Sequence, residues 1–114
     1  MKQEITRNGI KFTKIADTKF SYYYASKCGQ VYSQKTDKIL RPQRRAYPYV
    51  RLYNQTGKYT NYSLHVLIAE TFLGKRTYGL VVDHIDGNKQ NNSIDNLQFI
   101  TQSENVQKYY DGFK

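Results

Sequence analysis

Before residue 100, only one stretch of this chain carries apolar residues at helical spacing. In residues 63–74 the apolar side chains recur three and four positions apart, with Ser63 placed to cap the start and Gly74 to end the helix. The residues before it form short segments that alternate polar and apolar side chains or stop at turn residues. One helix among short strands predicts an α+β fold, and 114 residues leave room for one domain.

The predicted strands of the first part are short and rich in tyrosine, which suggests a small antiparallel sheet. They are 11–15, 20–26, 30–33, 38–40, 47–54 and 59–64. In 47–54, tyrosines and Arg51 alternate with apolar residues, and 55–58 has the composition of a turn that pairs this strand with the next one. The aliphatic face should meet the core. The tyrosine and arginine face is either a nucleic-acid surface or an ordinary half-buried strand face.

The second part begins with an apolar segment, 79–85, that predicts a buried strand ending in polar residues. A tight turn at 86–88, a loop at 91–96 and a strand at 97–101 follow. Thr101 and Glu104 have the spacing of a capping box, which predicts the start of a second helix.

Charge is distributed unevenly along the chain, whose formal net charge is +9. Residues 1–82 hold 15 Lys and Arg against 4 Asp and Glu, a net of +11, whereas 83–114 hold 3 against 5, a net of −2. A positive surface attracts polyanions, which favours nucleic acid over an acidic protein or a membrane surface. The basic residues expected to contact DNA are Arg41, Arg44, Arg45, Arg51, Lys75, Arg76 and Lys89.

Several classes of protein are disfavoured by the composition. Cys28 is the only cysteine, so neither an intrachain disulfide nor a cysteine-built structural zinc site can form. No apolar run approaches the ~20 residues of a membrane span, and the N-terminus lacks a signal-like apolar stretch. We expect an intracellular protein with no membrane contact and no small-molecule cofactor.

Asp83, His84 and Asn105 form the most informative polar set. Two antiparallel strands crossed by a helix can bring them together although 22 positions separate the first from the last. Carboxylate and amide oxygens suit Mg²⁺ or Mn²⁺, and a neutral imidazole can accept a proton from water. Such a set predicts phosphodiester hydrolysis, although ordinary turn chemistry also accounts for these residue types.

Residues 81–107 resemble the HNH endonuclease family, in the form found in phage and intron-encoded nicking enzymes. The elements of that pattern present here, in order, are Asp83-His84, Asp86-Gly87-Asn88, Asn91-Asn92, Asn96-Leu97 and Ser103-Glu104-Asn105. The helix at 64–74 is similar to the one that commonly precedes this motif. The resemblance covers most of 20–108.

We therefore expect one domain over 1–114 with three parts: a DNA-contacting, strand-rich part over 1–62, a helix and basic loop over 63–78, and a ββα-metal motif over 79–110. The resemblance implies that His84 is the general base and that Asp83 and Asn105 hold the metal. Asn96 would brace the loop so that His84 stays aimed. Asn105 stands where the family name has histidine, and an amide oxygen there favours Mg²⁺.

The remaining polar residues of the pattern are expected to form turns rather than to catalyse; they are Asp86, Asn88, Asn91 and Asn92. His65, on the first helix, is expected to pack rather than to act. The expected substrate is double-stranded DNA, and the expected state is a monomer or weak dimer. One chain has one such site, so a monomer should nick one strand, whereas cutting both strands would take two chains or two visits.

Two other functions remain open on sequence grounds. The chain could be a DNA-binding regulator or inhibitor built on an inactive or repurposed HNH fold, since a fold does not by itself fix an activity. It could also be a small RNA-binding protein that uses the same basic, aromatic surface.

Overall fold

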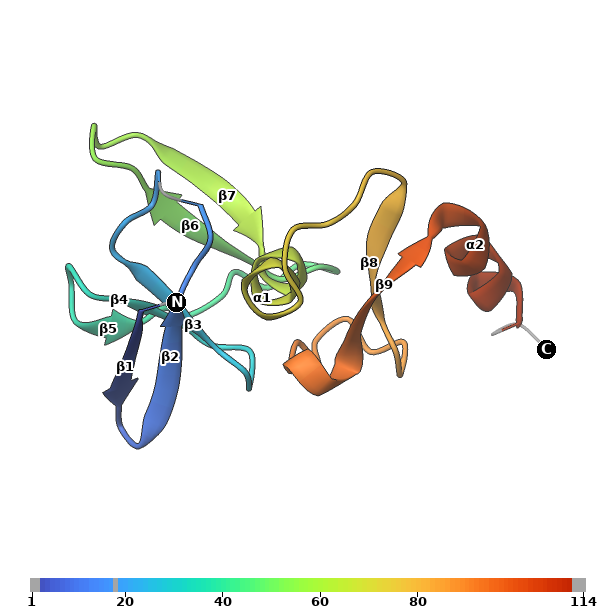
Figure 1. Ribbon diagram of the computed structural model, residues 1–114, viewed down its shortest axis with the longest axis horizontal. Helices are drawn as coiled ribbons and strands as arrows, with labels where there is room; N and C mark the ends of the chain where they lie inside the picture. Colours follow the sequence, from blue (N-terminus) through green and yellow to red (C-terminus); the bar gives the residue numbers. More distant parts are fainter. Residues whose placement is uncertain (1–2, 18, 112–114) are drawn as a thin grey trace.

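The computed structural model describes residues 3–17 and 19–111. The molecule is elongated, 46 × 29 × 29 Å, with a five-stranded sheet at one end and a strand pair with a helix at the other. Helix α1 lies between these two ends (Figure 1). The predicted α+β class is confirmed.

The five-stranded sheet is an antiparallel meander whose spatial order follows the chain. Its strands are β1 (Glu4–Arg7), β2 (Ile10–Lys14), β3 (Tyr23–Ser26), β4 (Val31–Ser33) and β5 (Lys38–Ile39). Most of these were expected within a few residues, but β1 was not. It pairs with β2 through a two-residue turn at Asn8 and Gly9, which have φ of 53° and 75°. Asn-Gly between two alternating segments is a strong hairpin signal, so β1 could have been predicted.

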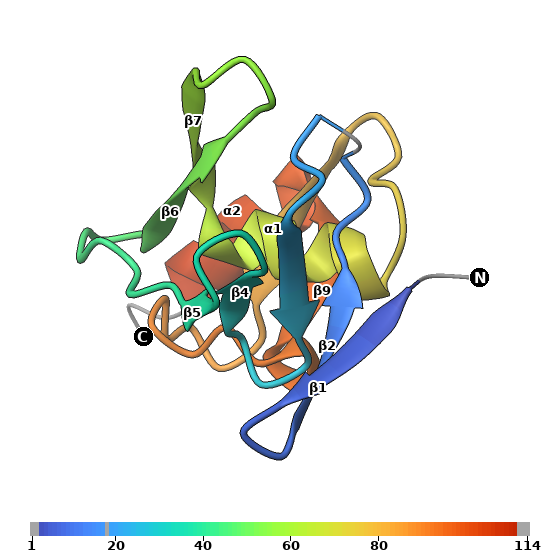
Figure 2. The same cartoon turned by 90° about the vertical axis from the view of Figure 1, so that its left-hand side faces the viewer.

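Strands β6 (Tyr49–Tyr53) and β7 (Tyr59–Ser63) form the predicted hairpin. Its alternation is as expected: Val50 and Leu52 are buried, whereas Arg51 and Tyr53 are exposed. The hairpin is a separate sheet rather than part of one tyrosine-rich sheet, and Figure 2 shows it standing apart from β1–β5. The Tyr53 backbone N–H donates to the Tyr23 hydroxyl at 2.9 Å and links the two sheets.

Helix α1 (Leu64–Phe72) follows β7 without a loop. The expected Ser63 cap is absent, because Ser63 is still paired in β7 and its side chain makes no capping bond. The Leu64 N–H donates instead to the Pro48 carbonyl, at 2.9 Å. Gly74, with φ of 94°, follows the helix end as expected.

The main core surrounds α1 and joins both ends of the molecule. Helix α1 contacts β3 and β7 on one side and β8, β9 and the short 3₁₀ helix η1 (Ile94–Asn96) on the other. The buried residues of this core are Ile15, Phe20, Tyr23, Ala25, Val31, Val50, Leu52, Leu64, Leu67, Ile68, Ala69 and Leu97. The two ends are therefore held together by apolar packing on one helix.

The second part has the predicted strand, loop, strand and helix order. Strand β8 (Leu80–His84) pairs antiparallel with β9 (Leu97–Thr101), and α2 (Gln102–Asp111) follows. The capping box is confirmed: the Thr101 N–H donates to Glu104 Oε1 at 3.0 Å, and the Glu104 N–H donates to Thr101 Oγ1 at 3.1 Å. Over the described residues, neither helix is long and apolar enough to cross a membrane.

Candidate active site

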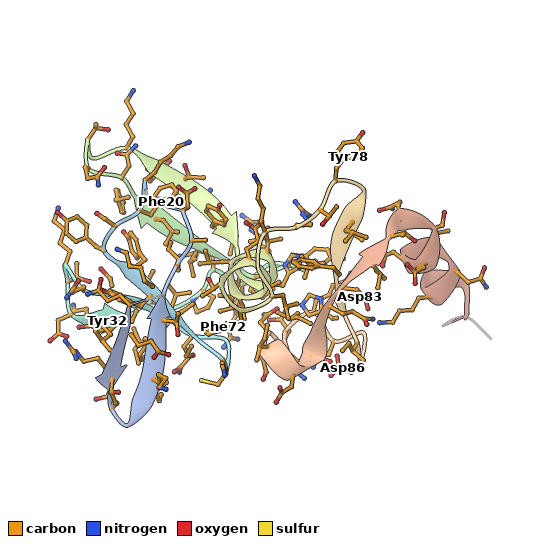
Figure 3. All side chains as sticks on the ribbon, in the orientation of Figure 1. Phe20, Tyr32, Phe72, Tyr78, Asp83 and Asp86 are labelled. Atoms are coloured by element: carbon orange, nitrogen blue, oxygen red, sulfur yellow. The ribbon has the colours of Figure 1, made fainter. Side chains whose placement is uncertain are left out.

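Asp83 and His84 are the last two residues of β8, and both are almost fully buried, with 7% and 5% of their surface exposed. The expected burial of this strand is thus strongest at its polar end, since Leu80, Val81 and Val82 are only half-buried. Successive side chains of a strand point to opposite faces. Asp83 accordingly faces α2, as Figure 3 shows, whereas His84 faces α1.

The imidazole of His84 is held by Asn92. Asn92 Oδ1 lies 2.7 Å from His84 Nε2, and Asn92 Nδ2 donates to the Lys89 carbonyl at 3.3 Å, which sets the orientation of the amide. An amide oxygen can only accept, so Nε2 carries the hydrogen and donates it. The lone pair of His84 is then on Nδ1, which is the atom able to accept a proton.

The His84 ring also belongs to a three-ring cluster with His65 of α1 and Tyr47. Its ring centroid lies 5.0 Å from that of His65 and 6.2 Å from that of Tyr47, and the His65 and Tyr47 centroids are 5.1 Å apart. Lys89 Nζ lies 4.8 Å from the Tyr47 ring centroid. This packing limits rotation of the His84 ring.

His65 is held in its neutral form. Burial lowers its pKa to about 4, and the nearby His84 and Arg76 act in the same direction. Its Nδ1 is buried without a hydrogen-bond partner among the described residues. His65 therefore packs against His84 without adding positive charge at neutral pH, in line with the packing role expected of it.

Asn96, at the end of η1, connects the turn after β8 to the loop before β9. Its Oδ1 accepts from the Asp86 N–H at 3.0 Å, and its Nδ2 donates to Asp86 Oδ1 at 2.8 Å and to the Asn91 carbonyl at 2.9 Å. Hydrogen bonds from Asn88, Asn91 and Asn96 lower the pKa of the Asp86 carboxyl. Asn96 thus braces the loop backbone, whereas the His84 side chain is held by Asn92.

The loop that carries Asn92 rests on the turn between β3 and β4. The Lys27 carbonyl accepts from the Ile94 N–H at 2.8 Å and from the Ser93 hydroxyl at 3.3 Å. Gly29 has φ of 93°, and a Cβ built there would lie 2.7 Å from the Asn92 carbonyl oxygen, closer than real contacts allow. Only glycine lets the turn approach the loop this closely.

The Asp83 carboxylate is neutralised by α2. Its Oδ2 accepts from Lys108 Nζ at 2.8 Å and from Gln98 Nε2 at 2.9 Å. Lys108 Nζ also donates to the carbonyls of His84, at 2.6 Å, and Ile85, at 3.0 Å. Three oxygen atoms from β8 and the residue after it therefore surround one ammonium group.

These oxygens suit a hard cation. Asn105 is half-buried and lies three residues before Lys108 on α2, so both residues are on the helix face that meets β8. Among the described residues, no hydrogen bond joins Asn105 to Asp83, and no three His, Cys, Asp or Glu side chains gather as a metal site. The Asp83 carboxylate, the Asn105 amide and the two carbonyls are nevertheless ligands of the kind that Mg²⁺ and Mn²⁺ accept.

The basic residues expected to contact DNA are all exposed, and all but Arg51 of β6 lie in loops. Arg41 and Arg44 line a groove of about 980 Å³ that reaches Asn92. Arg45 is not among the lining residues, but its carbonyl accepts at 3.2 Å from Nε2 of Gln90, which is. The groove therefore connects the arginine-rich segment before β6 to the loop that holds His84.

The other predicted basic residues lie outside this groove lining. Arg51 projects from the outer face of the β6–β7 hairpin, with its guanidinium carbon 4.0 Å from the Tyr59 ring centroid. Lys75 and Arg76 are exposed in the loop after α1, and Arg76 is close enough to influence His65. Lys89 covers the Tyr47 ring beside the three-ring cluster.

Sequence reasoning missed four residues of this site. The sequence predicts a turn-forming role for Asn92, because nothing in its spacing distinguishes it from Asn91. Lys108 could have been found, because its spacing of three from Asn105 puts it on the same helix face. Gln98 lies opposite Asp83 in the β8–β9 register, which requires the pairing to be known. Gly29 is significant only through its contact with Asn92.

Comparison with known proteins points to one family. A family model described as HNH endonuclease matches residues 62–107. DNA endonuclease I-HmuI of Bacillus phage SP01 is 41% identical over 88 residues, which are 75% of this chain and 50% of that protein. H-N-H endonuclease F-TflII of Escherichia phage T5 is 41% identical over 86 residues, 72% of this chain and 44% of that protein.

The fold has a counterpart among solved structures. A structure of the HNH homing endonuclease I-HmuI, which concerns DNA binding and cleavage, superimposes with a TM-score of 0.74 at 39% sequence identity. The match covers 79% of this chain and 52% of that one. The chain thus spans about half the length of these relatives.

Proposed function

Because the chain belongs to the HNH endonuclease family, we propose that it is a metal-dependent endonuclease that hydrolyses phosphodiester bonds in DNA. One observation carries the proposal. His84 is buried at the end of β8 with Nε2 bound to Asn92, and this leaves Nδ1 as the proton acceptor. A fixed imidazole with one free lone pair is what a general base for water requires.

In this proposal each polar residue of the motif has a separate task. His84 takes the proton from the attacking water, and Asn92 keeps its ring in the Nε2–H tautomer. Asn96 holds the turn at Asp86 against the loop, so that the end of β8 keeps its position. The three-ring packing with His65 and Tyr47 restricts the ring further.

Asp83 and Asn105 would hold the metal ion, Mg²⁺ or Mn²⁺. A bound divalent ion would stabilise the negative charge that develops on the phosphodiester and on the departing 3′ oxygen. The burial of the Asp83 carboxylate and the oxygens gathered around it support this assignment. One carboxylate and one amide form a weaker site than several carboxylates, so ion binding should respond strongly to any nearby charge.

Double-stranded DNA is the proposed substrate, acted on inside the cell. The groove lined by Arg41 and Arg44 leads to Asn92 and offers a path for one phosphate backbone to the active site. Arg51 on the hairpin, Lys75 and Arg76 after α1, and Lys89 beside Tyr47 would add phosphate contacts. With one such site per chain, a monomer would nick a single strand.

A plasmid-nicking assay with and without Mg²⁺ tests this function. The wild-type protein should convert supercoiled plasmid to the open circle only when Mg²⁺ is present. Asp83→Ala should abolish nicking, so that adding Mg²⁺ no longer has an effect. His84→Ala should lower the rate by ~10²–10⁴, the usual size of a lost general base, while DNA binding persists.

Three results would contradict the proposal. If His84→Ala cleaves at nearly the wild-type rate, His84 is not the base. If the wild-type protein binds duplex DNA but never nicks it under any divalent ion, the chain is a DNA-binding protein on an HNH fold. Preference for single-stranded RNA over duplex DNA in a competition experiment would instead indicate an RNA-binding protein.

A further inference from the structure

The ammonium group of Lys108 lies where a cation next to Asp83 would be placed. It donates to Asp83 Oδ2 at 2.8 Å and to the carbonyls of His84 and Ile85 at 2.6 and 3.0 Å. All three acceptors are oxygens, and all come from the end of β8 or the next residue. A lysine that donates to three protein acceptors has used its full set of donors.

In the metal-free protein, Lys108 compensates the buried negative charge of Asp83. Asp83 is buried to 7% exposure, and a buried carboxylate without a cation is strongly destabilising. Gln98 supplies one hydrogen bond to Asp83 but no charge. Within the part of the chain that the structure describes, Lys108 is the cation that compensates Asp83.

We propose that Lys108 is a displaceable placeholder cation, which occupies the oxygen pocket beside Asp83 until a divalent ion takes its place. The proposal rests on the proposed function, because it takes Asp83 as a metal ligand. In this proposal Lys108, on α2, influences how tightly the metal ion binds although it is not itself a ligand.

Displacement follows from geometry and charge. Mg²⁺ binds carboxylate oxygens at ~2.0–2.1 Å, and the ammonium already shares Asp83 Oδ2. Even an ion bound to the other carboxylate oxygen would lie within a few ångströms of the ammonium and be repelled by it. The Lys108 side chain is 37% exposed on a flexible four-carbon stem, so its head group has a route to solvent.

Calorimetric titration of Mn²⁺ into the DNA-free protein tests the proposal without relying on activity. Lys108→Met keeps the apolar stem and removes the charge, so it should bind Mn²⁺ about tenfold more tightly or better than the wild type. Lys38→Met on β5 is the matched control. It removes the same charge at the opposite end of the molecule and should leave the dissociation constant unchanged.

A third variant separates the two proposals. Asp83→Asn should abolish Mn²⁺ binding; if it does not, the metal site of the proposed function is wrong, and the placeholder role falls with it. If Asp83→Asn abolishes binding while Lys108→Met binds no more tightly than the wild type, the placeholder role alone is overturned.

A second measurement needs no variant, in case Lys108→Met does not fold. The Lys108 ammonium can be followed by ¹⁵N NMR in the wild-type protein during a Mg²⁺ titration. Its signal should move from that of a hydrogen-bonded group to that of a solvated lysine, with the same midpoint as ion binding. A signal that stays unchanged at saturating Mg²⁺ would overturn the proposal.

Discussion

The two ends of the molecule are stabilised in different ways. The far end of the five-stranded sheet is held by buried rings, with Phe12, Tyr24 and Tyr32 packed together. The β8–β9 end packs on α1 through apolar residues, but its polar loops are held by hydrogen bonds of buried amides, with Asn92 on the His84 ring and Asn96 on the turn and loop. Apolar burial has no preferred direction, whereas a hydrogen bond fixes the orientation of both partners.

The difference matches what each end has to do. A sheet that supports other elements needs stability, and apolar burial provides stability in proportion to the area removed from water. The proposed general base, His84, needs a fixed orientation toward its water molecule, and buried hydrogen bonds provide that at a smaller net gain in stability. Substitutions at the two ends should therefore separate stability from catalysis.

The largest expected effect is on stability, at the sheet end. Phe12→Ala should lower the free energy of unfolding by ~3–5 kcal/mol, because it removes a fully buried ring from its cluster. The nicking rate per folded molecule should not change. Urea unfolding gives the first quantity, and the nicking assay corrected for folded fraction gives the second.

Phe12→Leu serves as the milder companion, with a smaller loss of stability and again no change in rate. A lower nicking rate in this variant while the protein remains fully folded would show that the two ends are not separable in this way.

At the β8–β9 end, a substitution should change the nicking rate more than the free energy of unfolding. Asn92→Ala should lower the nicking rate by about 10–100-fold, by analogy with the loss of a residue that orients a metal-binding histidine. Asn91→Ala is the matched control. It removes a neighbouring amide, which donates to Asp86 at 3.0 Å and not to His84, so its effect on rate should be far smaller.

If the Asn91 and Asn92 variants lose activity equally, the loop acts through its overall shape rather than through the Asn92–His84 hydrogen bond. A Lys89 or Arg76 variant would not serve as a control, because both residues belong to the proposed DNA surface.

The smallest expected effect is the pH dependence of stability that arises from His65, which lies on α1 between the two ends. The pKa of His65 falls to about 4 in the folded protein from 6.5, so the unfolded chain binds the extra proton first as pH drops. The free energy of unfolding is therefore unaffected by His65 above about pH 6.5 and falls progressively as the pH drops toward 4. Because the side chain is partly exposed and screened, the loss should be on the order of 1–2 kcal/mol.

His65→Phe keeps a flat ring against His84 and Tyr47 but cannot titrate. Urea unfolding at several pH values should give a flatter stability profile for this variant between pH 6.5 and about 4. Identical profiles for the wild type and the variant would assign the acid sensitivity to other groups.

The elements that were predictable from sequence are those that depend on neighbouring residues. The capping box at Thr101 and Glu104, the alternation of Arg51 with its neighbours, and the strand that ends at His84 all depend on local spacing. The sequence signal for strand β1 is also local, because the Asn8-Gly9 turn indicates a hairpin. The separation of the β6–β7 hairpin from the five-stranded sheet depends on packing around α1, which no short segment encodes.

The same distinction applies to the candidate site. Asp83, His84, Asn96 and Asn105 were proposed from the motif, and the structure places the first two at the buried end of one strand. The partners that decide how these groups behave come from other segments. Asn92 and Lys108 bind the end of β8 from 8 and 25 residues away, at distances that only the tertiary structure defines.

The close approach of Gly29 to Asn92 limits how such a protein can be assembled by recombination. A nuclease motif moved behind a different N-terminal sheet would retain its own ion ligands and its own histidine. It would lose the support beneath the loop that aims that histidine, unless the new sheet presented a turn with no side chain at the same point. For this chain, the β3–β4 turn should therefore be transferred together with the motif if the loop is to keep its support.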